Sequence, residues 1–175
     1  MNLATDLLEQ AKMLANLDLK RPKQVNLRRS VSAAYYALFH LLSSEATALV
    51  VRDDFRLASR LNRTINHADM DKVSKSFAEN RLTKFLARKG DSFSLPSELI
   101  QVAKAFSGLQ EARHEADYDH SRTFSRDETI GFVNTADSAF AAWSAVRQTD
   151  AARLFLTGFS MWGAWNKPPR GKGDQ

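Results

Sequence analysis

The sequence contains no cysteine, which excludes disulfide bonds and thiolate chemistry and favours a reducing, intracellular environment. It also has no apolar run approaching the roughly 20 residues that a membrane span requires. The longest candidate, residues 154–165, is shorter and is interrupted by Gly158 and Gly163. The first residues lack the basic and apolar segments of a signal peptide. We therefore expect a cytoplasmic protein that does not associate with membranes.

Motifs of metal and phosphate-loop chemistry are missing as well. The four histidines are His40, His67, His114 and His120, and none of them shows the paired spacing of a zinc ligand set. The chain has neither a glycine-rich phosphate loop nor a nucleophile elbow. We therefore expect no metal and no cofactor.

The balance of residue types is that of a folded protein with a mild excess of positive charge. Hydrophobic residues make up 43% of the chain and charged residues 26%, which suits one domain with its own core. The formal net charge is +5, and a basic balance favours polyanionic partners. Many proteins of similar charge bind no nucleic acid, so charge alone leaves the partner open.

Glycine and proline are scarce, and neither occurs between residues 23 and 89. Long stretches without helix breakers, rich in Ala, Leu, Lys, Arg and Glu, predict helices rather than strands. Helices are predicted at about 3–17, 23–49, 54–62, 68–87, 96–113 and 125–153, with a loop at 88–96. Glu128, three residues after Ser125, indicates a capping box at the start of the last helix.

The expected fold is therefore all-α, an up-and-down antiparallel helical bundle of five to six helices. We expect a single domain over residues 1–165, with the helix at 23–49 in its centre. Residues 166–175 are basic and contain Pro and Gly, which predicts a disordered tail. The aromatic residues before that tail either cover a hydrophobic groove of a second protomer or partner, or pack within their own chain as the last turns of the final helix. These residues are Phe155, Phe159, Trp162 and Trp165.

The polar run at 113–120 (Arg-His-Glu-Ala-Asp-Tyr-Asp-His) is the most unusual segment of the chain. The buried stripe of the helix at 96–113, continued with helical period, reaches Arg113 and then His120. Seven residues make nearly two turns, so these two side chains are expected on one face. Asp117, four residues after Arg113, is placed to pair with it. Because ionisable groups on a core-directed stripe are costly unless paired or used, the run is either a functional site or a structural ion-pair cluster.

Two groups of arginines are candidates for contact with nucleic acid. Arg28 and Arg29 end a basic run that begins at Lys20, and Arg56 and Arg60 lie on one face of a short helix. The alternative is that these are ordinary solvated helix faces. Aromatic residues at 35, 36 and 39 are expected to pack in the core, with one tyrosine hydroxyl within reach of the Arg113 cluster.

Two segments resemble a known family. Residues 32–40 (Ser-Ala-Ala-Tyr-Tyr-Ala-Leu-Phe-His) are similar to the central-helix signature of HEPN domains, named for higher eukaryotes and prokaryotes nucleotide-binding. Residues 113–119 resemble the Arg-x-x-Ala-Asp-Tyr motif of the bacterial members. The resemblance covers about 3–152 in helix order, and the two motifs occur in the expected order and separation.

The resemblance implies a helical bundle that forms a homodimer, often with the polar motif facing the cleft between protomers. Active members are metal-independent endoribonucleases, many of them in toxin–antitoxin or defence systems. They share an Arg with a polar neighbour, four to six intervening residues and then a His. This pattern makes Arg113 and His120 the catalytic candidates. The supporting candidates are His114, Asp117, Tyr118 and Tyr35.

In such a mechanism His120 would transfer a proton at the ribose hydroxyl or the leaving oxygen, and Arg113 would hold the scissile phosphate. The Arg-x-x-Ala-Asp-Tyr subgroup does not regularly carry the later His, and Asp117 and Asp119 add negative charge beside the phosphate site. The alternative is a non-catalytic module that binds a nucleotide, RNA or a protein, with an antitoxin or a small nucleotidyltransferase as partner.

Overall fold

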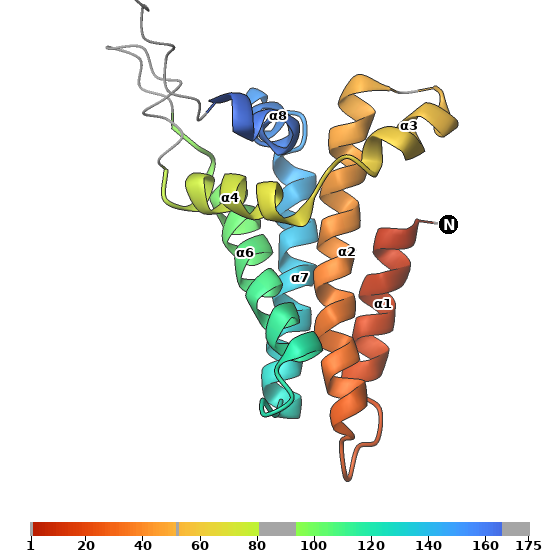
Figure 1. The fold of residues 1–175 in the computed structure, drawn as a ribbon. Helices are drawn as coiled ribbons and strands as arrows, with labels where there is room; N and C mark the ends of the chain where they lie inside the picture. Colours follow the sequence, from red (N-terminus) through yellow and green to blue (C-terminus); the bar gives the residue numbers. More distant parts are fainter. Residues whose placement is uncertain (1, 52, 81–93, 166–175) are drawn as a thin grey trace, which may run out of the picture.

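The computed structural model describes residues 2–51, 53–80 and 94–165 (Figure 1). These residues form helices and contain no strand, which confirms the all-α fold. The helices are α1 (Leu3–Ala15), α2 (Gln24–Val50), α3 (Phe55–Asn62), α4 (His67–Ala78), α6 (Ser97–Tyr118), α7 (Arg126–Val146) and α8 (Asp150–Trp165). The described part of the chain thus holds seven helices, more than the five or six expected. None of these seven is long and apolar enough to cross a lipid bilayer.

Four long helices, α1, α2, α6 and α7, lie side by side, and α4 and α8 run across one end of them (Figure 1). Helix α2 is central, as predicted, since it packs against α1, α6, α7 and α8. Its buried residues lie on more than one face, since Ala33 and Leu38 are both buried although five residues, about 140° of rotation, separate them. The crossing of α4 and α8 differs from an arrangement in which every helix runs up and down.

The predicted helix at 125–153 is two helices, which corrects the sequence prediction. Helix α7 ends at Val146, and α8 begins at Asp150 after a short turn. The Thr149 hydroxyl accepts a hydrogen bond from the Ala152 N–H at 3.1 Å, which caps the new helix. The change of direction lets α8 bury Phe155 against α4, where its ring centroid lies 5.0 Å from that of Phe77. Phe155 and Phe159 are therefore buried in the core of their own chain.

Helix α4 ends at Ala78, earlier than the predicted end at residue 87. Asn80 has a φ of 54°, the left-handed conformation that commonly follows a helix end. Residues 81–87 of the predicted helix and 88–93 of the predicted loop lie outside the described residues, while 94–96 are not helical. The predicted tail at 166–175 also lies outside them.

Two neighbouring side chains, Ser125 and Arg126, stabilise the start of α7 and the connection between α1 and α2. The Ser125 hydroxyl accepts a hydrogen bond from the Glu128 N–H at 3.1 Å, so the predicted cap at Ser125 is confirmed. Arg126, the next residue, donates to the carbonyls of Ala15, Leu17 and Asp18 at 2.8–3.1 Å. These carbonyls lie at the end of α1 and just beyond it, where the helix leaves them without partners. Arg126 therefore ties the α1–α2 connection to the start of α7.

Candidate functional site

Arg113 and Asp117 on α6 form the centre of the candidate site. The Arg113 Nε lies 2.7 Å from Asp117 Oδ2, which confirms the predicted pair four residues apart. Both side chains are half-buried, at 21% and 19% exposed. Two residues of α2 complete the network, since Arg113 Nη2 donates to the Tyr36 hydroxyl at 2.8 Å and the Ser32 hydroxyl donates to Asp117 Oδ1 at 2.6 Å. The ion pair is thus fixed from the facing helix.

Aromatic rings cover the Arg113 guanidinium. Its Cζ lies 5.4 Å from the centroid of Tyr36 and 5.2 Å from that of Tyr118, within the range of cation–π attraction. Burial lowers the pKa of Arg113, but Tyr36, Asp117 and Tyr118 outweigh it and the pKa is raised. The guanidinium therefore stays charged.

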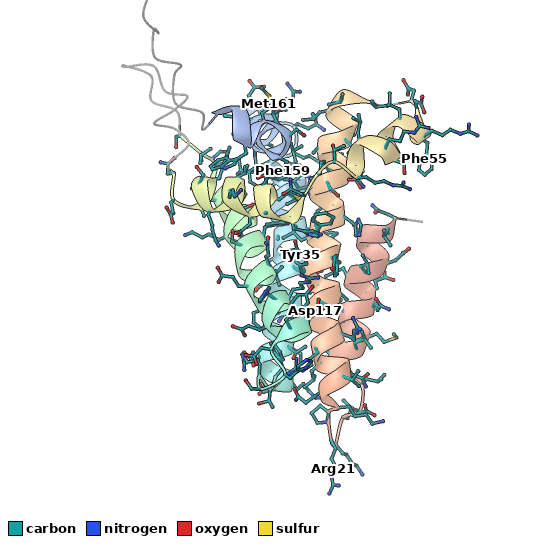
Figure 2. All side chains as sticks on the ribbon, viewed as in Figure 1. Arg21, Tyr35, Phe55, Asp117, Phe159 and Met161 are labelled. Carbon is teal, nitrogen blue, oxygen red and sulfur yellow. The ribbon has the colours of Figure 1, made fainter. Side chains whose placement is uncertain are left out.

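One tyrosine hydroxyl reaches Arg113, as expected, and it is that of Tyr36 rather than that of Tyr35. The Tyr35 hydroxyl oxygen lies 2.6 Å from Nδ1 of His67, the first residue of α4. Burial raises the pKa of Tyr35 far above its usual range, with Arg113 acting against the rise. Figure 2 shows Tyr35 and Asp117 at successive levels between α2 and α6, with Tyr35 nearer to α4.

A group of rings around His67 adjoins the Arg113 network. The His67 ring is stacked on Phe39 with centroids 4.1 Å apart, and the Tyr36 ring lies nearly perpendicular to it with centroids 6.1 Å apart. His40 lies 6.4 Å from Tyr36 on the same side. Burial lowers the pKa of His40. Burial also lowers the pKa of His67, and the nearby Arg113 and His40 lower it further by smaller amounts. Sequence reasoning gave His67 no role, because its partners come from a helix more than 25 residues earlier.

His120 does not share a helix face with Arg113, which corrects the sequence prediction. Helix α6 ends at Tyr118, and Asp119 is extended with φ −90° and ψ 98°. The Asp119 carboxylate accepts hydrogen bonds from the backbone N–H and the hydroxyl of Ser121 at 2.9 and 2.6 Å. Such a side-chain turn competes with helix continuation. The seven-residue spacing therefore spans a helix end rather than two helical turns.

His120 is exposed and lines a surface groove of about 400 Å³. Arg28, Arg29, Asp117 and Arg122 line the same groove, whereas Arg113 does not. The structure therefore brings His120 to Asp117 and to two arginines of α2, but leaves Arg113 on the side of Asp117 that faces Tyr36. The remaining candidate, His114, is exposed, and its ring lies 5.0 Å from that of Tyr118.

The four candidate nucleic-acid arginines lie in two places. Arg28 donates to the carbonyls of Ala116 and Asp119 at 2.8 and 2.9 Å and to that of Arg122, so it caps the end of α6. Arg29 is exposed beside it. Arg56 and Arg60 are exposed on α3, at the opposite end of α2 (Figure 1). The two pairs therefore do not form one continuous basic surface.

In the described parts of the chain, no three His, Asp or Glu side chains come together as metal ligands. The arrangement offers instead a fixed guanidinium, a tyrosine hydroxyl and imidazoles, which are groups that bind oxyanions and move protons. Comparisons with family models, curated proteins and solved structures give no match to this chain.

Proposed function

We propose that this chain is a HEPN-like domain whose Arg113 centre binds a phosphate group of RNA or of a nucleotide without cleaving it. One observation carries the proposal: the Arg113 Cζ lies 5.4 and 5.2 Å from the ring centroids of Tyr36 and Tyr118, and the guanidinium pairs with Asp117 and donates to the Tyr36 hydroxyl. A guanidinium fixed in this way is suited to planar, directional contact with phosphate oxygens. The two sequence motifs supply the family assignment.

The geometry favours binding over catalysis. General acid–base cleavage needs a proton-transfer group within reach of the phosphate that the arginine holds. His120 lies beyond the end of α6 and lines a groove to which Arg113 does not contribute.

With this function we propose the remaining features that the resemblance implies. These are an up-and-down core of the bundle, a homodimer with the polar motif at the cleft between protomers, and a cytoplasmic location. An antitoxin or a small nucleotidyltransferase is the proposed protein partner. Sedimentation of the purified protein over a range of concentrations tests the homodimer directly.

The test of phosphate binding is a titration of fluorescently labelled single-stranded RNA and of a labelled adenine nucleotide, followed by anisotropy in EDTA at low salt. Arg113→Lys keeps the charge but loses the planar fork, and we expect about tenfold weaker binding, or 1.4 kcal/mol. Lys104→Ala on the same helix is the control, because Lys104 is exposed and away from the network. If wild type binds neither probe, the proposed function is wrong.

A second candidate function is a metal-independent endoribonuclease. It is favoured by one observation, that His120 and Arg29 line the same open groove. Total RNA would be incubated in EDTA with wild type and with His120→Ala. Cleavage by wild type that His120→Ala abolishes would establish this activity and would contradict a purely binding role.

A further inference from the structure

His67 is the histidine next to the Arg113 network, and its ring is held on three sides. The Phe39 ring stacks on it with centroids 4.1 Å apart, and the Tyr36 ring lies nearly perpendicular to it with centroids 6.1 Å apart. The Tyr35 hydroxyl lies 2.6 Å from its Nδ1. The residue is nevertheless exposed, at the first position of α4. Within the described parts of the chain, Nδ1 is the only nitrogen of this exposed ring that makes a hydrogen bond, which leaves Nε2 to meet a ligand.

The state of this imidazole follows from the burial of Tyr35. Tyr35 is only 1% exposed, and in the described residues its hydroxyl has no hydrogen-bond partner other than His67. A buried hydroxyl without an acceptor is costly, so the Tyr35 hydroxyl donates and Nδ1 accepts. The proton of a neutral His67 then lies on Nε2. Burial raises the pKa of Tyr35 and lowers that of His67, which keeps the tyrosine protonated and the histidine neutral.

His67 and Arg113 flank the same ring. The Arg113 Cζ lies 5.4 Å from the Tyr36 centroid, and the His67 ring centroid lies 6.1 Å from it. His40 on α2 lies near His67, and Asp71 on α4 lies near Tyr35, where Lys75 pairs with the Asp71 carboxylate at 2.9 Å. Around Tyr36 there are thus two hydrogen-bond donors, one of them cationic. The Asp71 carboxylate pairs with Lys75 through Oδ2, while its Oδ1 is buried without a hydrogen-bond partner among the described residues.

We propose that His67 is a ligand-binding residue of the Arg113 centre and donates its Nε2–H to a phosphate oxygen, with Tyr35 as the positioning residue that fixes this tautomer. The inference rests on the proposed function, because it assumes that the centre takes a phosphate group. The phosphate belongs either to a free nucleotide or to the backbone of single-stranded RNA. His120 has no part in this contact.

The test combines binding with NMR of the histidine ring nitrogens. Protein labelled with ¹⁵N in its histidines would be titrated with AMP and separately with short single-stranded RNA, both in EDTA. We expect the unliganded His67 to show the Nε2–H tautomer and its Nε2 signal to shift when the probe binds. A shift with AMP identifies a free nucleotide as the source, and a shift with RNA alone identifies the backbone.

Four variants separate binding from structure. His67→Phe keeps the stacking on Phe39 but removes the donor, and we expect about tenfold weaker binding; His67→Gln keeps an N–H donor and should recover part of it. Tyr35→Phe should redistribute the His67 tautomers, a change that loss of packing alone would not produce. Lys104→Ala, the exposed control on α6, should bind as wild type.

The outcomes distinguish this inference from the proposed function. If wild type binds a probe while His67→Phe binds equally well and the His67 signals do not move, the role of His67 is disproved and phosphate binding stands. If wild type binds neither AMP nor RNA, the proposed function fails and the role of His67 fails with it.

Discussion

Two adjacent arginines on α2 have different consequences for stability. Arg28 donates hydrogen bonds to three carbonyls at and beyond the end of α6, whereas Arg29 is exposed. We expect Arg28→Ala to lower the free energy of unfolding by about 2–3 kcal/mol, because helix-end carbonyls lose charged donors. Arg29→Ala should change it by less than about 0.5 kcal/mol. Urea denaturation of both variants gives the comparison, and equal effects would refute the capping role.

The histidines around Tyr36 predict how stability depends on pH. Burial lowers the pKa of both His40 and His67 in the folded protein. The unfolded chain therefore takes up protons near pH 6.5 while the folded protein does not, so their stabilising effect is complete above that pH. It is lost as the pH falls from about 6.5 towards the folded-state values.

We expect the free energy of unfolding of wild type to fall between pH 7 and pH 5. In His67→Gln, which has one such histidine fewer, the fall should be smaller. Urea denaturation at each pH measures both slopes. Parallel curves for the two proteins would show that His67 is not responsible.

Residue spacing within one helix predicted part of this site. It failed where residues far apart in the sequence determine the position of a side chain. The Arg113–Asp117 pair follows from a spacing of four residues within one helix, so the sequence predicted it. The position of His120 depends on the turn at Asp119 and on Arg28, which approaches from another helix. The bond between Tyr35 and His67 likewise joins residues 32 apart. No pattern within one helix contains that information.

At the level of elements, helix identity was predictable and some helix ends were not. Breaker-free stretches indicated the helices, and Ser125 indicated the start of α7. The junction between α7 and α8 contains neither glycine nor proline. It breaks because α8 gains burial against α4, which is a tertiary effect that overrides helix propensity.

The role of α8 can be measured with two of its residues. Phe155 is fully buried against Phe77, while Met161 is 44% exposed at the outer surface of α8 (Figure 2). We expect Phe155→Ala to lower the free energy of unfolding by about 3–5 kcal/mol through the lost burial and the cavity left behind. Met161→Ala should cost well under about 1 kcal/mol. A small effect of Phe155→Ala would mean that α8 is not part of the core.

For the whole molecule, the net charge of +5 and the separation of its basic surfaces predict how RNA binding responds to salt. If three phosphates are neutralised, affinity should fall about twentyfold between roughly 50 and 200 mM salt. Arg29 lies at the groove beside Asp117, and Arg56 belongs to α3, which lies at the far end of α2. We expect Arg29→Ala to reduce the salt dependence and Arg56→Ala to leave it unchanged. The reverse result would indicate that RNA binds at α3.

Arg126 binds carbonyls at the end of α1, and Arg28 binds carbonyls at the end of α6. Both therefore clamp the same end of the molecule, where α1 and α6 end and α7 begins (Figure 1). At the other end α3 packs chiefly on α2 and has no buried residue. Amide hydrogen exchange should therefore be graded along α2, slowest near Leu27 and fastest near Val50. The molecule would open reversibly from the α3 end, and the clamped end would exchange only when the whole chain unfolds.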